Sequence, residues 1–266
     1  MPAFLKLQLL AILQGITEFL TVSSSAHLVL VQKWLNAESI VGQEGGPLLE
    51  LLLHFGTLLA ILAFYRRRLT DLACGLVRRD APSWRYSLAL VLSCIPAGLF
   101  YFLAHHQIES FFDGRPFRTG LLLICTGLIL FSLRLIPASR PTADKPTLLK
   151  ALGIGCAQAL AILPGLSRSG STFTAGRWLG LSSEAAFDFT FLMSIPVIGG
   201  GILLKLKKLS HLFSSGHTAA LLTATLLAAV VGFASLKAIS LVRRTGKIWW
   251  FGFYCTAVGL LLLLCH

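Results

Sequence analysis

Two short polar segments of this 266-residue chain hold the side chains that could do chemistry. The first runs from Gln14 to His27 and the second from Gln158 to Ser171, at a constant offset of 144 residues. Together they contain a carboxylate, an imidazole, a guanidinium and several hydroxyls. Such groups are costly at membrane depth, so they normally line a cavity walled by protein. The duplication predicts one site built from both halves of the chain.

The first segment combines an acid, a run of hydroxyls and a histidine. Gln14 and Glu18 are four residues apart, so a helix places them on one face. The run Ser23-Ser24-Ser25 exceeds what capping one helix requires, and hydroxyls around a helix start can bind an anion. His27 follows within one turn. A lone histidine in an apolar segment is more often structural, but its neighbours here favour acid–base or nucleophilic work.

The second segment supplies a cation. Arg168 stands in the run Ser167-Arg168-Ser169-Gly170, with Thr172 close behind. Glycine lets backbone approach a ligand, and arginine makes planar contacts to phosphate oxygens. The alternative is a tight turn in which Arg168 pairs with Glu18. We expect an anion site, because an arginine among hydroxyls and glycines suits a phosphate. A pairing of Arg168 with Glu18 is compatible with this site, since it can form when no anion is bound.

Two further polar residues lie at the start of an apolar segment. Glu50 and His54 share a helix face four residues apart, near the outer end of the first full span. We expect them at the rim of the site.

The composition indicates a protein that crosses the membrane several times. The chain is 55% hydrophobic and 13% charged, against about 25% charged in soluble domains. Six apolar segments approach the length of about 20 residues that a spanning helix needs. They are residues 47–65, 86–104, 118–137, 184–204, 217–242 and 248–265.

The segments are ordered as two repeats of an all-α fold. Residues 3–35 break at Val22 to Ser25, and residues 148–180 break at Pro164-Gly165 and again at Ser169-Gly170. Each pair of short pieces predicts a re-entrant hairpin, and three spans follow each hairpin. Because three is odd, the second repeat enters from the opposite face, which gives inverted repeats. The predicted units are residues 1–136, a cytoplasmic linker at 137–147, and residues 148–266.

The distribution of charge argues against a nucleic-acid partner. Basic residues crowd three loops, of which the largest set spans Arg66 to Arg85, with Trp84 as the single aromatic residue among them to stack a base. This bias instead places those loops in the cytoplasm. The C-terminus and the mouth of the site then lie outside. The six cysteines, at 74, 94, 125, 156, 255 and 265, read as small apolar side chains, not as a disulfide set or a zinc site.

These motifs resemble those of the undecaprenyl-diphosphatase family of bacterial inner membranes, also known through bacitracin resistance. The family pattern joins an (E/Q)xxxE helix to a PVSSTGH-like turn, and here it stands as Gln14 to Glu18 followed by Thr21 to His27. The PGxSRSGxT turn stands complete at Pro164 to Thr172, and residues 50–56 are similar to an ExxxQxG segment.

The resemblance implies hydrolysis of undecaprenyl diphosphate, which recycles the cell-wall lipid carrier. Glu18 would be the acid–base or metal-binding carboxylate, with a divalent cation such as Mg²⁺ or Ca²⁺. Ser24 or His27 would be the nucleophile, and the sequence leaves this choice open. Arg168 would clamp the diphosphate. The partners expected are polyprenyl diphosphate and membrane lipids, with a homodimer left open.

Three departures from the family pattern stand near the site: Thr21 for proline, Ala26 for glycine and His54 for glutamine. They put the turn geometry and the affinity for a metal in question. The main rival function is a transporter or flippase of the lipid phosphate, since inverted repeats are common in such carriers. An anion channel fits less well, because the two polar turns are short. A carrier needs no nucleophile, so Glu18, Ser24 and His27 together favour an enzyme.

Overall fold

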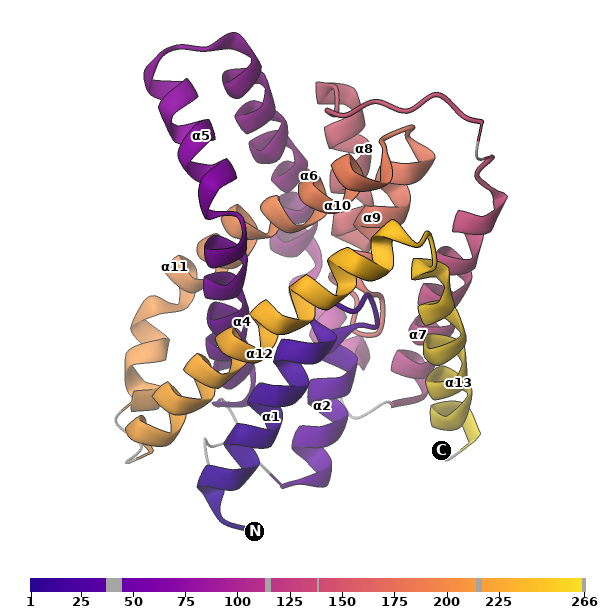
Figure 1. Cartoon of the computed structure of the whole chain (residues 1–266). Helices are drawn as coiled ribbons and strands as arrows, with labels where there is room; N and C mark the ends of the chain where they lie inside the picture. The colour runs from indigo at the N-terminus through magenta and orange to yellow at the C-terminus, as the bar shows by residue number, and fades with distance from the viewer. Residues whose placement is uncertain (37–44, 113–115, 138, 214–216, 265–266) are drawn as a thin grey trace.

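The computed structural model describes residues 1–36, 45–112, 116–137, 139–213 and 217–264, and these ranges are almost entirely helical (Figure 1). An isolated bridge between Ala143 and Leu181 is the β-pairing found within them. The predicted all-α, multi-span class is confirmed. Cys265, one of the six cysteines considered above, lies outside the described residues.

The first half holds a helical hairpin followed by three long helical segments. Its elements are α1 (Ala3–Thr17), α2 (Ser24–Trp34), α4 (Gly45–Phe64), α5 (Arg66–Val77), α6 (Ala81–Phe112), α7 (Pro116–Phe131) and the 3₁₀ turn η1 (Ser132–Leu135).

The second half repeats this order. Its elements are α8 (Leu148–Leu160), α9 (Arg168–Trp178), α10 (Ser183–Leu192), α11 (Ser194–Phe213), α12 (Thr218–Arg244), η2 (Ile248–Trp250) and α13 (Phe251–Leu264). The hairpin α8–α9 therefore matches α1–α2, and α12 and α13 match α6 and α7.

Several helices in the described ranges are long and apolar enough to cross a membrane. Four qualify outright, and α4 with α5 makes a fifth if that pair, bent by 74°, counts as one span. The segment Ile248–Leu264 is a shorter apolar helix, at the lower end of the length range of a span. The protein is thus a multi-pass membrane protein.

Two predicted segments differ from the structure. Residues 66–77 form α5, where the sequence predicts part of a basic loop. The predicted span 184–204 is confirmed as a candidate span, Ser183–Lys205, but it is divided at Met193 into two helices, α10 and α11. The apolar run continues through this break, so hydropathy alone gives no sign of it.

The two hairpin turns also differ from each other. The first lies where the sequence places it, and α2 begins at Ser24. In the second, the predicted break at Ser169-Gly170 is wrong, because α9 begins at Arg168 and contains both residues. The reason is a helix cap: the hydroxyl of Ser167 accepts a hydrogen bond from the backbone N–H of Gly170 at 3.1 Å.

Each hairpin packs on the other half of the chain. Helix α1 lies along α12, and α8 lies along α6. Both contacts are close: a Cβ on Gly15 would stand 2.9 Å from the backbone of Gly232, and one on Gly155 would stand 2.4 Å from the carbonyl oxygen of Ser93. Glycine therefore allows the backbones to approach, as in many membrane helix pairs.

Helices α7 and α13 occupy equivalent positions in the two halves and lie side by side (Figure 1). Gly120 contacts Gly259, and Gly127 contacts Gly252, so the two helices run antiparallel. Opposite directions of equivalent helices are what an inverted repeat requires.

Candidate active site

A cavity of about 480 Å³ lies where the tips of the two hairpins meet α4, α6 and α11. One end of its lining is polar and comes from both hairpins. The predicted residues in that lining are Glu18, Ser23, Ser24, Ser25, His54, Ser167, Arg168 and Ser169. The two copies of the polar segment thus contribute to one cavity.

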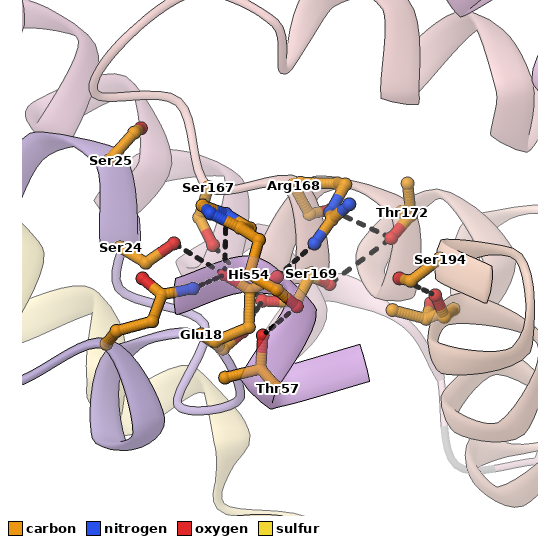
Figure 2. A network of polar contacts seen from close by, with 12 residues as sticks. Glu18, Ser24, Ser25, His54, Thr57, Ser167, Arg168, Ser169, Thr172 and Ser194 are labelled. Atoms are coloured by element: carbon orange, nitrogen blue, oxygen red, sulfur yellow. Dashed lines mark hydrogen bonds and ion pairs between the residues drawn. The ribbon is translucent and has the colours of Figure 1, made fainter. Parts of the chain in front are cut away.

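Glu18 is the centre of the polar contacts (Figure 2). It follows the last residue of α1, and its side chain is 4% exposed. One carboxylate oxygen, Oε1, pairs with the guanidinium of Arg168 from the other half of the chain. The other, Oε2, accepts hydrogen bonds from the Ser24 hydroxyl at 2.7 Å and the Gln14 amide at 3.1 Å. Nε2 of His54 lies 3.2 Å from the same oxygen.

The first turn holds Ser24 against Glu18. Thr21 and Ser23 have positive φ angles, of 63° and 66°, which reverse the chain within a few residues. Helix α2 then starts at Ser24, so its first backbone N–H groups lie beside the cavity. Unpaired N–H groups at a helix start favour a bound anion.

The second turn presents Arg168 in the same way. Arg168 is the first residue of α9, which is capped by Ser167. The backbone N–H of Ser167 donates to the hydroxyl of Thr126 at 3.0 Å, and that hydroxyl donates to the carbonyl of Gly165 at 2.9 Å. Sequence reasoning gave no role to Thr126, which lies on α7 and fixes this turn from outside the hairpin.

Direct contacts join the two hairpin tips. The hydroxyl of Ser169 donates to the backbone carbonyl of Glu18 at 3.2 Å. Thr172 donates to the carbonyl of Arg168 at 2.8 Å, within α9. The first interaction joins the start of α9 to the backbone of Glu18, and the second lies within α9, so Ser169 and Thr172 support the helix start that carries Arg168.

His27 lies outside the cavity lining. Its Nδ1 is 2.8 Å from the carbonyl oxygen of Ser23, and its Nε2 is 2.9 Å from the hydroxyl of Tyr254. A carbonyl only accepts, so Nδ1 carries the proton and Nε2 accepts from the tyrosine. The Tyr254 ring also stacks on the imidazole, with centroids 5.6 Å apart. Sequence reasoning missed Tyr254, which stands 227 residues away and in an apolar segment.

His54 lies deeper than the expected rim. Its Nε2 faces the carboxylate of Glu18, and its Nδ1 donates to the carbonyl of Glu50 at 2.8 Å. The carbonyl of His54 accepts from the hydroxyl of Thr57 at 3.0 Å. Glu50 itself is absent from the lining of the cavity. The spacing of four residues correctly placed Glu50 and His54 on one face of a helix. It did not predict how deep in the cavity His54 would meet Glu18.

Other predicted residues lie behind the cavity, and some lining residues were not predicted. Gln14, Gly170 and Thr172 are buried next to the lining instead of in it. Gln158 and Lys205 line the cavity. Gln158 is the counterpart of Gln14 in the repeat, so the offset of 144 residues was a usable signal for it.

Comparison with known proteins bears on the whole chain. The sequence model of the bacitracin resistance protein BacA family matches residues 7–261. The chain belongs to this family. A relative from Desulfatibacillum aliphaticivorans, named undecaprenyl-diphosphatase, is 35% identical over 99% of both chains. A relative of the same name from Thermotoga maritima is 37% identical over 95% of this chain and 97% of its own.

The structure shows the conformation and contacts of residues that depart from, or vary within, the BacA family pattern. Thr21 has a φ of 63°, which a proline ring cannot adopt because it fixes φ near −65°. His54 occupies the position of a glutamine and, like an amide, donates toward Glu18. Gln14, where glutamate also occurs, is fully buried and donates its amide to the same carboxylate.

The donor set around Glu18 does not form a metal site by itself. In the described part of the chain, no three His, Cys, Asp or Glu side chains gather at one point that could hold a metal ion. The oxygens of Glu18 already face Arg168, Ser24, Gln14 and His54. The side chains alone therefore do not fit the divalent cation that the family resemblance implies.

Proposed function

We propose that this protein hydrolyses undecaprenyl diphosphate to undecaprenyl phosphate and inorganic phosphate, recycles the cell-wall lipid carrier and confers resistance to bacitracin. Membership of the BacA family and relatives named undecaprenyl-diphosphatase support this activity. The observation that carries the proposal is the arrangement of a serine, a carboxylate and an arginine in one cavity. The name of the relatives also favours the enzyme over the transporter.

Arg168 binds the terminal phosphate in this proposal. Its side chain is 22% exposed and uses one of its nitrogens on Glu18, which leaves further N–H donors for phosphate oxygens. The first backbone N–H groups of α2 and α9 lie beside the same space. Preorganised donors of this kind stabilise the charge that develops on a transferring phosphoryl group.

Ser24 is the nucleophile that the geometry favours. Its hydroxyl already donates to Glu18 at 2.7 Å, which is the separation expected of a nucleophile and its base. Its oxygen attacks the terminal phosphorus, the bond from phosphorus to the bridging oxygen breaks, and the hydroxyl proton passes to Glu18. Undecaprenyl phosphate leaves, and a phosphoserine remains.

Water completes the cycle. It attacks the phosphorus of the phosphoserine, and the proton held by Glu18 returns to the serine oxygen. One proton of the water stays on the released phosphate, and the other passes to solvent. His27 takes no covalent part in this scheme, because both of its ring nitrogens are already engaged in hydrogen bonds, to the Ser23 carbonyl and the Tyr254 hydroxyl. It positions the Ser23 carbonyl, and with it the start of α2.

A divalent cation remains part of the proposal only as a partner of the substrate. Magnesium usually keeps several waters and is held by one or two carboxylates together with substrate phosphates. Glu18 would be its carboxylate here. If the cation is required, a chelator abolishes phosphate release and added Mg²⁺ or Ca²⁺ restores it. Undiminished release in the chelator would remove the cation from the proposal.

The site is proposed to open to the outer side of the bacterial cytoplasmic membrane. The support is the excess of arginine around α5, which places that helix in the cytoplasm. A reporter fused after Arg79 is expected to read as cytoplasmic, and one at the C-terminus as external. The reverse result would invert the orientation. Light scattering of the solubilised protein tests whether the chain forms a homodimer, which the sequence leaves open.

The activity is tested by phosphate release from undecaprenyl diphosphate in detergent. Glu18→Gln and Ser24→Ala should each lower kcat by about a hundredfold or more. Glu184→Gln and Ser83→Ala remove a carboxylate and a hydroxyl outside the cavity lining, and should behave as the parent. Acid quenching of the parent with labelled substrate should trap phosphoserine. A folded parent that releases no phosphate would overturn the activity, and an active Ser24→Ala would overturn only the nucleophile.

A further inference from the structure

The part of the cavity beyond Glu18 is built mainly from two apolar helix faces. On α6, the lining residues are Cys94, Ala97, Gly98, Tyr101 and Phe102. On α11 they are Pro196, Val197, Gly200, Gly201, Leu204 and Lys205. Both sets recur at intervals of three, four and one residues, so each forms a single stripe along its helix.

The two stripes face the same space without closing it. Helix α6 packs chiefly on α8, and α11 packs chiefly on α4. The lining residues Phe102, Pro196 and Leu204 remain exposed at the molecular surface. The cavity thus runs from the polar cluster at Glu18 to an opening between α6 and α11.

Glycine lies near the middle of both stripes, and packing does not explain it. A Cβ on Gly98 or Gly200 would meet no atom of the described chain within 4 Å. By contrast, glycines at the helix contacts, such as Gly15 and Gly155, have backbone within 3 Å of the same point. Glycine inside a helix costs about 1 kcal/mol relative to alanine, so a position without a close neighbour gains nothing structural from it.

We propose that Gly98 and Gly200 are specificity-determining residues that keep a channel open for the first isoprene units of the substrate tail. The inference rests on the proposed function and adds to it the path of the tail and the residues that set its width. The chemistry of the walls fits an unsaturated hydrocarbon. A cavity of 480 Å³ has the size of a small-molecule site and is far too small for a whole undecaprenyl chain. The rest of the tail leaves through the opening between α6 and α11 into lipid.

The neighbouring glycine supplies a matched control. Gly199 lies on the same helix, and a Cβ there would also meet no described atom within 4 Å, but Gly199 is not in the lining. A leucine at 199 therefore projects away from the channel, whereas a leucine at 200 projects into it. Both substitutions replace a helical glycine in open surroundings, so both variants should fold as the parent does.

The first arm of the test compares tail lengths. Gly200→Leu and Gly98→Leu should lower kcat/KM for undecaprenyl and farnesyl diphosphate by about tenfold or more, the scale of a steric change in an apolar pocket. Dimethylallyl diphosphate, whose single isoprene unit occupies the least of the channel, should lose much less. Gly199→Leu should keep the parental ratio of the three substrates. An equal loss of kcat/KM on all three substrates, as expected of a water-filled entrance, would overturn the proposal. So would kcat/KM values that stay parental on all three.

The second arm needs no hydrolysis. Cys94 lies one helical turn from Gly98 on the same stripe. In a protein whose other cysteines are replaced by alanine, a thiol reagent should label Cys94, and farnesyl phosphate should slow this labelling. The protection should persist in Gly199→Leu and disappear in Gly200→Leu, each compared with its own rate without lipid. Protection without phosphate release would reject the enzyme but keep the channel, and no protection in an active parent would reject the channel alone.

Discussion

Arg168 and Glu18 form an ion pair between the two halves of the chain, at the polar end of the cavity. Arg168→Ala should lower kcat by about a hundredfold or more, because a preorganised donor to the developing charge is lost. Arg168→Lys should recover only part of this loss, since a single ammonium lacks the planar fork. Phosphate release under saturating substrate measures both.

Arg177→Ala is the matched control for that experiment. It removes a guanidinium from the last turn of the same helix, at a position outside the cavity lining. Its activity should stay near that of the parent. If Arg168→Ala were as active as Arg177→Ala, Arg168 would be no more than a structural partner of Glu18.

His27 and Tyr254 form a second pair of residues that act together. Tyr254→Phe removes only the hydroxyl that donates to Nε2, and His27→Gln removes the imidazole that holds the Ser23 carbonyl. Tyr254→Phe loses one hydrogen bond of about 1 kcal/mol and should lower kcat about fivefold, whereas His27→Gln loses both hydrogen bonds of the ring and should lower kcat about tenfold or more. Because both act on the same turn, the double variant should be no worse than the worse single variant.

The steady-state kinetics of the two single variants and the double variant test this coupling. Losses that multiply would show that the two residues act separately. A loss in His27→Gln as large as that in Ser24→Ala would instead return His27 to the role of nucleophile.

At the scale of single residues, the sequence predicted that Glu18 and Arg168 come together, but it did not predict the detailed geometry of the site. The repeat brought Glu18 and Arg168 together, because equivalent turns of two inverted halves face each other. It could not give the depth of His54, which depends on how far α4 slides against the hairpin. It also could not find Tyr254, since a tyrosine in an apolar segment carries no mark of its partner.

Among the elements, the first hairpin turn carries backbone strain at Thr21. Its φ of 63° is unfavourable for a β-branched residue, at a cost of about 1–3 kcal/mol. Thr21→Gly should relieve this strain and, after the added freedom of the unfolded chain, raise the free energy of unfolding by about 1 kcal/mol. Thr21→Pro should destabilise the protein, because the ring cannot reach a positive φ.

The midpoint of thermal unfolding in detergent measures both variants, and Thr245→Gly is the control. Thr245 is a threonine directly after the end of α12, and its φ is −79°, which threonine tolerates. Glycine there should lower the midpoint slightly. Equal shifts in Thr21→Gly and Thr245→Gly would mean that Thr21 stores no strain.

The ends of the elements show where sequence patterns are sufficient. The breaks after α1 and α8 follow polar and glycine-containing runs, and the structure agrees to within a few residues. The start of α9 was misplaced because Gly170 was taken as a breaker, although it is the residue whose N–H the cap satisfies. Helix α5 was missed because its arginines indicated a loop, and they instead lie on an amphipathic helix.

Helices of each half of the chain pack against helices of the other half, and these contacts hold the whole molecule together. Helix α1 packs on α12, α8 packs on α6, and α7 runs antiparallel to α13. The ion pair of the site is one polar link across this interface. A second joins Arg68, just after the α4–α5 bend, to Asp188 on α10, where the hydroxyl of Tyr65 also donates to the carboxylate at 2.9 Å.

The link at Asp188 should stabilise the assembly of the two halves. The Asp188 side chain is 14% exposed, so Asp188→Asn leaves the partly buried Arg68 guanidinium with its contacts to Tyr86 but without a carboxylate partner. We expect a loss of about 1–3 kcal/mol in the free energy of unfolding, below the value of a fully buried pair because Arg68 is 36% exposed. Thermal unfolding in detergent measures the loss.

Glu184→Gln on the same helix is the matched control, since Glu184 faces Arg243 at 3.8 Å and its side chain is 74% exposed. An exposed pair of this kind contributes about 0–1 kcal/mol, so the midpoint should barely move. The remaining folded fraction of Asp188→Asn should keep a near-parental KM, because Asp188 does not line the cavity. If Asp188→Asn unfolds no earlier than Glu184→Gln, the two halves are held by helix packing and the pair at Glu18, and the Arg68–Asp188 link contributes nothing measurable.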